Sequence, residues 1–126
     1  MAPILVVEDN EINAEIITTL LESYGFPNEL AVDGEDSVDK CQSKPKDYYS
    51  LILMDIHMPR MNGYDAARTI KEDLAMQAPV IAQTATHTSE ESIEAHHAYI
   101  SEYLQKPFRP EQLVSLIRKY VTCPTG

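Results

Sequence analysis

Five side chains capable of chemistry each follow a short, largely apolar run of this sequence. They supply three carboxylates, one hydroxyl and one ammonium group: Glu8, Asp9, Asp55, Thr84 and Lys106. Mg²⁺ is bound in proteins by one or two carboxylates together with waters and phosphate oxygens. A hydroxyl and an ammonium group beside such carboxylates can reach phosphoryl oxygens. These residue types therefore indicate a site for a divalent cation and a phosphoryl group.

The runs that precede these residues are typical of buried parallel strands. They cover 4–7, 51–54, 80–82 and 103–104, and helical patterns separate them. Parallel strands all point the same way, so the residues that follow them collect at one edge of the sheet. Open α/β sheets bind ligands in a crevice outside that edge. We therefore expect the five side chains to share one pocket, with Asp55 at its floor.

The helical patterns predict how the rest of the chain covers the sheet. Asn10 is predicted to cap a helix that ends at Gly25. Its apolar stripe is Ile12, Ile16, Ile17, Leu20, Leu21 and Tyr24. Further helices are predicted from Gly34 to about Cys41, from Tyr64 to Leu74, from a capping Thr88, and from Pro110 to Val121.

The order of these elements predicts the fold class. A half-polar run at 29–32 indicates an edge strand, which makes five strands and five helices in strict alternation. Right-handed crossovers then place helices on both faces of the sheet. We expect an α/β protein with a doubly wound five-stranded parallel sheet, in strand order 2-1-3-4-5, forming one domain over 1–126.

Composition and charge exclude several classes of function. The chain has 126 residues and a formal net charge of −10, with no basic stripe of the kind that binds nucleic acid. The same acidity argues against binding to an anionic membrane surface, and no apolar run approaches the roughly 20 residues that span a bilayer. Cys41 and Cys123 are not expected to form a disulfide, and the expected compartment is the cytoplasm.

The same residues suggest what the pocket does with a phosphoryl group. A carboxylate at the position of Asp55 can attack phosphorus and form an acyl phosphate. Lys106 can pair with one phosphoryl oxygen and Thr84 can donate its hydroxyl to another. Taken one at a time, these residues are more typical of solvated strand ends and loops, so the interpretation depends on their convergence.

Five short motifs also carry a resemblance to a known family. In order they are Val7-Glu8-Asp9-Asn10, Met54-Asp55-Ile56-His57-Met58-Pro59-Arg60-Met61-Asn62-Gly63, Thr84-Ala85, Tyr103 and Lys106-Pro107. In this order and spacing the chain resembles, over essentially its full length, the receiver domain of two-component response regulators.

The resemblance implies a phosphoacceptor site with a bound cation. Asp55 would accept a phosphoryl group from a phosphohistidine on a histidine kinase or a histidine phosphotransfer protein. Mg²⁺ would be held by Asp9, Asp55 and the backbone carbonyl of His57, with Glu8 acting through water. Lys106 would be joined to the next residue by a cis peptide bond that aims its side chain. Such domains also catalyse the loss of their own phosphoryl group.

The resemblance further implies a switch and an output surface. Thr84 would move towards the phosphoryl group and Tyr103 would turn inward after it. The fourth helix, fifth strand and fifth helix would then contact a downstream protein target. The segment before the fifth strand departs from the family pattern, because it lacks the usual glycine and reads Ala98-Tyr99-Ile100.

Two histidine features allow more than one interpretation. His57 could shield an acyl phosphate or bind a partner, and an exposed loop histidine is the simpler alternative. His96 and His97 are adjacent on a predicted helix, so they do not face the same way and are expected on its solvated face.

Other functions fit the residues less well. A phosphatase of the haloacid dehalogenase type needs a second aspartate two residues after the nucleophile, where this chain has His57. A flavodoxin-type carrier would place a flavin phosphate where Glu8 and Asp9 would repel it. A pseudo-receiver that only binds other proteins is the non-catalytic alternative. The chain is expected to be either a stand-alone regulator or the receiver module of a hybrid kinase.

Overall fold

The computed structural model describes residues 2–56, 58, 61–84, 90–96 and 98–121. Strands and helices alternate along the chain. The strands are β1 (Ile4–Val7), β2 (Asn28–Ala31), β3 (Leu51–Asp55), β4 (Val80–Thr84) and β5 (Glu102–Gln105). The helices are α1 (Glu11–Ser23), α2 (Gly34–Gln42), α3 (Gly63–Arg68), α4 (Glu90–His96) and α5 (Pro110–Tyr120), and a π-helical segment, η1 (Thr69–Asp73), continues α3.

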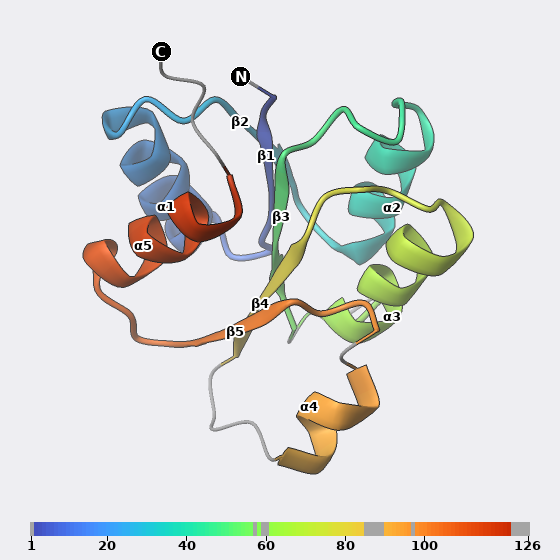
Figure 1. Ribbon diagram of the computed structural model, residues 1–126. Coiled ribbons are helices and arrows are strands. Elements are labelled where there is room, and N and C mark those ends of the chain that lie inside the picture. The colour runs from blue at the N-terminus through green and yellow to red at the C-terminus, as the bar shows by residue number, and fades with distance from the viewer. Residues whose placement is uncertain (1, 57, 59–60, 85–89, 97, 122–126) are drawn as a thin grey trace.

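The five strands form one parallel sheet in the order β2-β1-β3-β4-β5. Figure 1 shows α1 and α5 on one face of this sheet, α2 and α3 on the other, and α4 at the bottom of the view. The predicted fold class and strand order are therefore confirmed. The predicted edge strand is present as β2, displaced by one residue from the expected range.

Alternate strand residues divide the core into two layers, as the period of two in a strand requires. In β1, Leu5 and Val7 pack on the layer under α2 and α3, whereas Ile4 and Val6 pack on the layer that includes α1 and α5. All four residues are fully buried. A strand covered on both faces reads as a continuous apolar run, which is why this pattern predicted the sheet.

The first three helices begin with a polar cap at the carboxyl edge of the sheet. Asn10, Asp33 and Asn62 each accept a hydrogen bond from a backbone N–H in the first turn of α1, α2 and α3. A side-chain oxygen at this position satisfies a donor that has no partner within the helix. The predicted cap at Asn10 is thus confirmed, and the predicted cap at Thr88 lies outside the described residues.

The predicted apolar stripe of α1 is only partly correct. The side chains of α1 that are buried against the sheet are Ala14, Ile17 and Leu21. Ile12 is 70% exposed and Ile16 is 60% exposed, and Tyr24 is also exposed. Each residue turns an α-helix by about 100°, so the row of Ile12 and Ile16 points away from the row of Ile17. The apolar stripe is wider than the surface the sheet can cover.

Two predictions for the later helices also need correction. The pattern from Tyr64 to Leu74 predicted one α-helix, but its second half is the π-helical segment η1. His96 was expected on a solvated face, yet its ring stacks on Tyr64 with centroids 3.8 Å apart and lies edge-on to Tyr99. Aromatic packing across to α3 therefore holds the end of α4.

Candidate functional site

The predicted carboxylates meet at the carboxyl edge of the sheet. Glu8 and Asp9 directly follow β1, and Asp55 is the last residue of β3, the neighbouring strand. One carboxylate oxygen of each residue lies within 4.8 Å of the others. Three carboxylates at this separation offer the oxygen ligands that Mg²⁺ prefers. These residues therefore fit a divalent cation.

Lys106 brings a positive charge to the same group. Its Nζ lies 3.3 Å from Oε1 of Glu8 and 3.6 Å from Oδ2 of Asp55. The backbone N–H of Lys106 donates to the carbonyl oxygen of Thr84 at 2.7 Å, which holds the lysine beside the end of β4. The peptide bond between Lys106 and Pro107 is cis, as the resemblance implies.

The carboxylates differ in their exposure to solvent. Glu8 is 2% exposed and Asp55 is 5% exposed, whereas Asp9 is exposed. Burial, a hydrogen bond to Asp55 and the charge of that carboxyl raise the pKa of Glu8 to about 7. The ammonium of Lys106 and the N–H of Asn10, which donates to Glu8 Oε2 at 3.3 Å, act in the opposite direction. Burial, together with the adjacent Asp55, thus outweighs the nearby cation.

The proposed switch residues lie on β4 and β5. Thr84 ends β4 and is 4% exposed. Tyr103, on β5, packs partly buried against the core layer of α2 and α3, and its hydroxyl oxygen is buried. Burial and the neighbouring Tyr64 raise the pKa of Tyr103. The aromatic ring is therefore already turned towards the interior.

The loop between β3 and α3 packs closely under Asp55. The N–H of Gly63 donates to the carbonyl oxygen of Ile56 at 2.9 Å. A Cβ added at Gly63 would lie 2.7 Å from Cα of Ile56 and even closer to the carbonyl oxygen of Asp55. Only glycine allows this approach of the two backbones. The carbonyl of His57, a predicted cation ligand, lies outside the described residues.

One polar residue of the site escaped the sequence analysis. Gln83 is the residue of β4 that pairs with Asp55 of β3, and it is completely buried. The available signal was a glutamine next to the apolar run 80–82, because polar side chains are uncommon in buried strands. Thr84, which ends the same strand, was the only residue of β4 predicted from the sequence to belong to the site.

Comparisons with known proteins agree with this geometry. The sequence matches the response regulator receiver domain family over residues 4–118. The chain belongs to this family. It is 32% identical over 126 residues to the osmosensing histidine protein kinase SLN1 of Saccharomyces cerevisiae. This match covers 98% of the chain but only 10% of that kinase.

Two solved structures resemble this receiver domain closely. The receiver domain of sensor histidine kinase PA1611 from Pseudomonas aeruginosa has 31% identity and a TM-score of 0.80, covering 97% of this chain and 98% of that one. Its crystal structure contains a magnesium ion coordinated in the active-site cleft. The chemotaxis protein CheY4 of Vibrio cholerae, with 24% identity, a TM-score of 0.84 and coverage of 96% and 99%, shares the fold.

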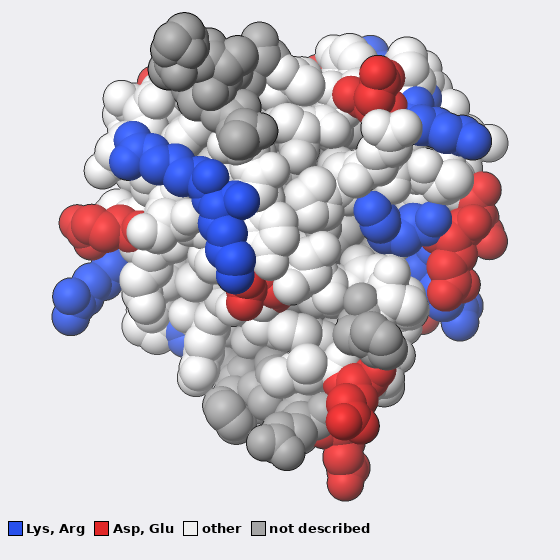
Figure 2. Space-filling model, viewed as in Figure 1, with Lys and Arg blue, Asp and Glu red and all other residues white. Residues whose placement is uncertain are grey.

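The charges on the described surface relate to nucleic-acid binding, and the lengths of the described helices relate to membrane insertion. Figure 2 shows basic side chains in small groups beside acidic ones on the face in view, and acidic side chains over the position of α4. Glu91 and Glu94 are exposed on that helix. Within the described residues, none of the helices is long and apolar enough to cross a bilayer.

Proposed function

We propose that this receiver domain is a phosphoaspartate switch in which Asp55 accepts a phosphoryl group from a phosphohistidine. The observation that carries the proposal is the position of Lys106, whose ammonium lies 3.6 Å from Asp55 within the group of three carboxylates. A buried carboxylate flanked by a cation on one side and a cation-binding group on the other is suited to attack a phosphoryl group.

The transfer step exchanges one bond to phosphorus for another. A carboxylate oxygen of Asp55 attacks the phosphorus atom, and an O–P bond forms as the N–P bond of the phosphohistidine breaks. The leaving nitrogen keeps the bonding electron pair and takes a proton from solvent. Lys106 pairs with a phosphoryl oxygen, and Thr84 donates its hydroxyl to another. To end the signal, water attacks the phosphorus atom, the O–P bond to Asp55 breaks, and inorganic phosphate leaves as the carboxylate is restored.

Mg²⁺ is the proposed cofactor. Asp9, Asp55 and the backbone carbonyl of His57 would hold it, with Glu8 acting through water. When bound, the ion neutralises negative charge on the transferring group. The chain itself orients the reacting carboxylate, because Asp55 is fixed at the end of β3 and Glu8 is tied to the N–H of Asn10.

The proposed switch runs from Asp55 to α4 and β5. Thr84 moves towards the phosphoryl group, Tyr103 fills the space beside it, and a protein target binds the surface of α4, β5 and α5. A ligand biases a domain only through contacts that differ between two states. The buried Tyr103 hydroxyl supports such a path, since the partly buried side chain contacts the core layer of α2 and α3.

The proposed phosphodonor is a histidine kinase or a histidine phosphotransfer protein. Relatives of this chain include histidine kinases of which it spans about a tenth or less, and this supports a place in a phosphorelay. The domain acts in the cytoplasm, either as a stand-alone regulator or as one module of a hybrid kinase. The free, buried thiol of Cys41 supports a reducing compartment.

Labelling with a small phosphodonor tests the central proposal. Acetyl phosphate and Mg²⁺ should add one phosphoryl group, detected by intact mass, that is stable to acid and removed by hydroxylamine. Asp55→Ala should abolish this mass increase. Asp39→Ala removes an exposed acid of α2 and should leave it unchanged.

Two results would contradict the proposal. Labelling of Asp55→Ala at the wild-type level would place the phosphoryl group elsewhere. Absence of labelling in a folded wild-type protein, by acetyl phosphate and by a panel of phosphorylated kinases and phosphotransfer proteins, would indicate a pseudo-receiver that acts only by binding.

A further inference from the structure

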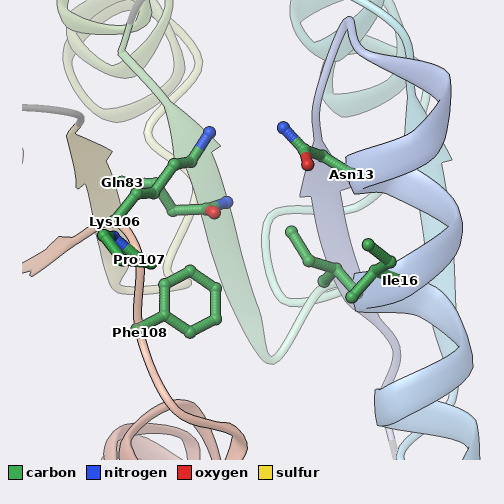
Figure 3. A pocket seen from close by; sticks show the side chains of 7 residues that line it. Asn13, Ile16, Gln83, Lys106, Pro107 and Phe108 are labelled. Carbon is green, nitrogen blue, oxygen red and sulfur yellow. The ribbon is translucent and has the colours of Figure 1, made fainter.

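A cavity of about 470 Å³ lies between α1 and the segment that follows β5. The cavity is lined by three polar side chains and four apolar ones: Asn13, Gln83 and Lys106, and Ile16, Ile17, Pro107 and Phe108. Figure 3 shows the ends of Asn13, Gln83 and Lys106 directed towards the same upper part of the cavity. Ile16 and Phe108 face each other across its lower part. The volume is in the range of small-molecule pockets.

Among the residues that line this cavity, Gln83 says most about what could bind there. The residue is 0% exposed, and within the described part of the chain neither its Oε1 nor its Nε2 has a hydrogen-bond partner. A buried polar group left without a partner destabilises the folded state. Buried polar groups in folded proteins nearly always have a hydrogen-bond partner, so we expect this carboxamide to bind a partner in the cavity.

The arrangement of the polar atoms defines the chemistry of that partner. A carboxamide presents a donor and an acceptor side by side, and its complement is another amide edge with an acceptor and a donor. Asn13 offers a second such group from the opposite wall. The apolar surfaces of Ile16 and Phe108 suit a flat ring below the amide edge.

Charge near the cavity favours a neutral ligand. Lys106 lines the cavity, but its ammonium already lies 3.3 Å from Glu8 and 3.6 Å from Asp55. An added anion would gain little from this engaged cation and would be repelled by the two carboxylates. A cation would lie next to the ammonium itself.

We propose that this cavity is a binding site for a small, uncharged aromatic amide or lactam. The amide edge pairs with the carboxamides of Gln83 and Asn13, and the ring lies between Ile16 and Phe108. Binding is independent of phosphoryl transfer. If the proposed function holds, the ligand also lies against Lys106 and changes the rate at which Asp55 is phosphorylated.

Benzamide is the minimal probe, and acetophenone is its matched control because a methyl group replaces the amide nitrogen. Titration of the ¹⁵N-labelled protein, without Mg²⁺ or phosphodonor, should shift the side-chain amide signal of Gln83 and the backbone signals of Ile16 and Phe108. Benzamide should bind at least tenfold more tightly than acetophenone. Gln83→Leu should remove this preference while leaving the protein as stable as the wild type or more so.

Asn13→Ala gives a second variant at the cavity mouth that does not alter the core. It should weaken benzamide binding more than acetophenone binding, and it keeps the test decisive if Gln83→Leu folds poorly. Equal affinity for the two probes, no detectable binding of benzamide, or an unchanged preference in both variants would overturn the proposal. Each result would mean that the carboxamides of Gln83 and Asn13 do not select an amide ligand. None of them depends on whether Asp55 is phosphorylated.

Discussion

The raised pKa of Glu8 predicts that the metal-free domain loses stability as the pH rises. In the unfolded chain a glutamate ionises near 4.5, whereas in the folded domain Glu8 ionises near 7. The folded state thus binds the extra proton between these values. The stabilisation is fully present below about pH 4.5 and is lost as the pH rises through about 7.

The magnitude follows from the size of the shift. The change from 4.5 to about 7 corresponds to about 3 kcal/mol, at roughly 1.4 kcal/mol for each pKa unit. The side chain of Glu8 is only 1% exposed, so solvent screens this interaction little. For a domain of this length, about 3 kcal/mol equals a change in melting temperature of roughly 10 °C.

Glu8→Gln isolates this contribution, because glutamine has nearly the same shape and does not ionise. In buffer with EDTA, its free energy of unfolding should exceed that of the wild type by up to about 3 kcal/mol at pH 8 and be similar at pH 4.5. Urea unfolding across this pH range measures the difference. Saturating Mg²⁺ should stabilise the wild type at pH 8 and should stabilise Glu8→Gln less.

Asp9→Asn is the matched control, since it removes an exposed carboxylate from the same group. It should weaken Mg²⁺ binding but change the metal-free pH dependence far less than Glu8→Gln does. Parallel pH profiles for the wild type and Glu8→Gln would refute the reasoning, because they would show that Glu8 remains ionised in the folded domain.

Three further predictions concern the packing of α1, of the loop under Asp55 and of the core. Ile12→Gln should change the free energy of unfolding by less than about 0.5 kcal/mol, whereas Ile17→Ala should lower it by about 2–5 kcal/mol in urea titrations; equal losses would contradict the orientation of α1. Gly63→Ala should lower the melting temperature and weaken Mg²⁺ binding measured by calorimetry, because the added Cβ meets the carbonyl oxygen of Asp55. Burial raises the pKa of the Cys41 thiol to about 12, so peptide mass spectrometry should find that iodoacetamide labels Cys41 only as fast as the protein unfolds. Rapid labelling of Cys41 in the folded protein would contradict this.

The fold and the convergence of the site could be predicted because both follow from strand direction. Four short apolar runs identified strands buried on both faces, and parallel strands must deliver the residues that follow them to one edge. Glu8, Asp9, Asp55 and Lys106 therefore had to meet wherever the sheet order placed their strands together. Adjacent positions of β1 and β3 in the sheet then bring the carboxylates within 4.8 Å of one another.

The orientation of α1 could not be predicted in the same way, because helical periodicity does not say how much of a stripe is covered. The six apolar residues of the predicted stripe, five of them on α1, formed one broad face in the sequence. The sheet buries only the row that includes Ile17, and Ile12 and Ile16 remain exposed. Ile17 and Leu21 share their core layer with residues of α5, which lies far along the chain, so the periodicity of α1 alone does not contain this information.

Gln83 could not be predicted for the same reason: the sequence does not show which residues surround it. Charged and neutral polar residues differ in this respect. Carboxylates that follow several neighbouring buried strands point to chemistry together, since their charges meet at one edge and need a cation to relieve the repulsion. A neutral amide within a strand acquires meaning only when its neighbours are known. For Gln83 the decisive facts are complete burial, pairing with Asp55 and a cavity against α1. Its role therefore has to be argued from hydrogen bonds that are left open in the folded domain.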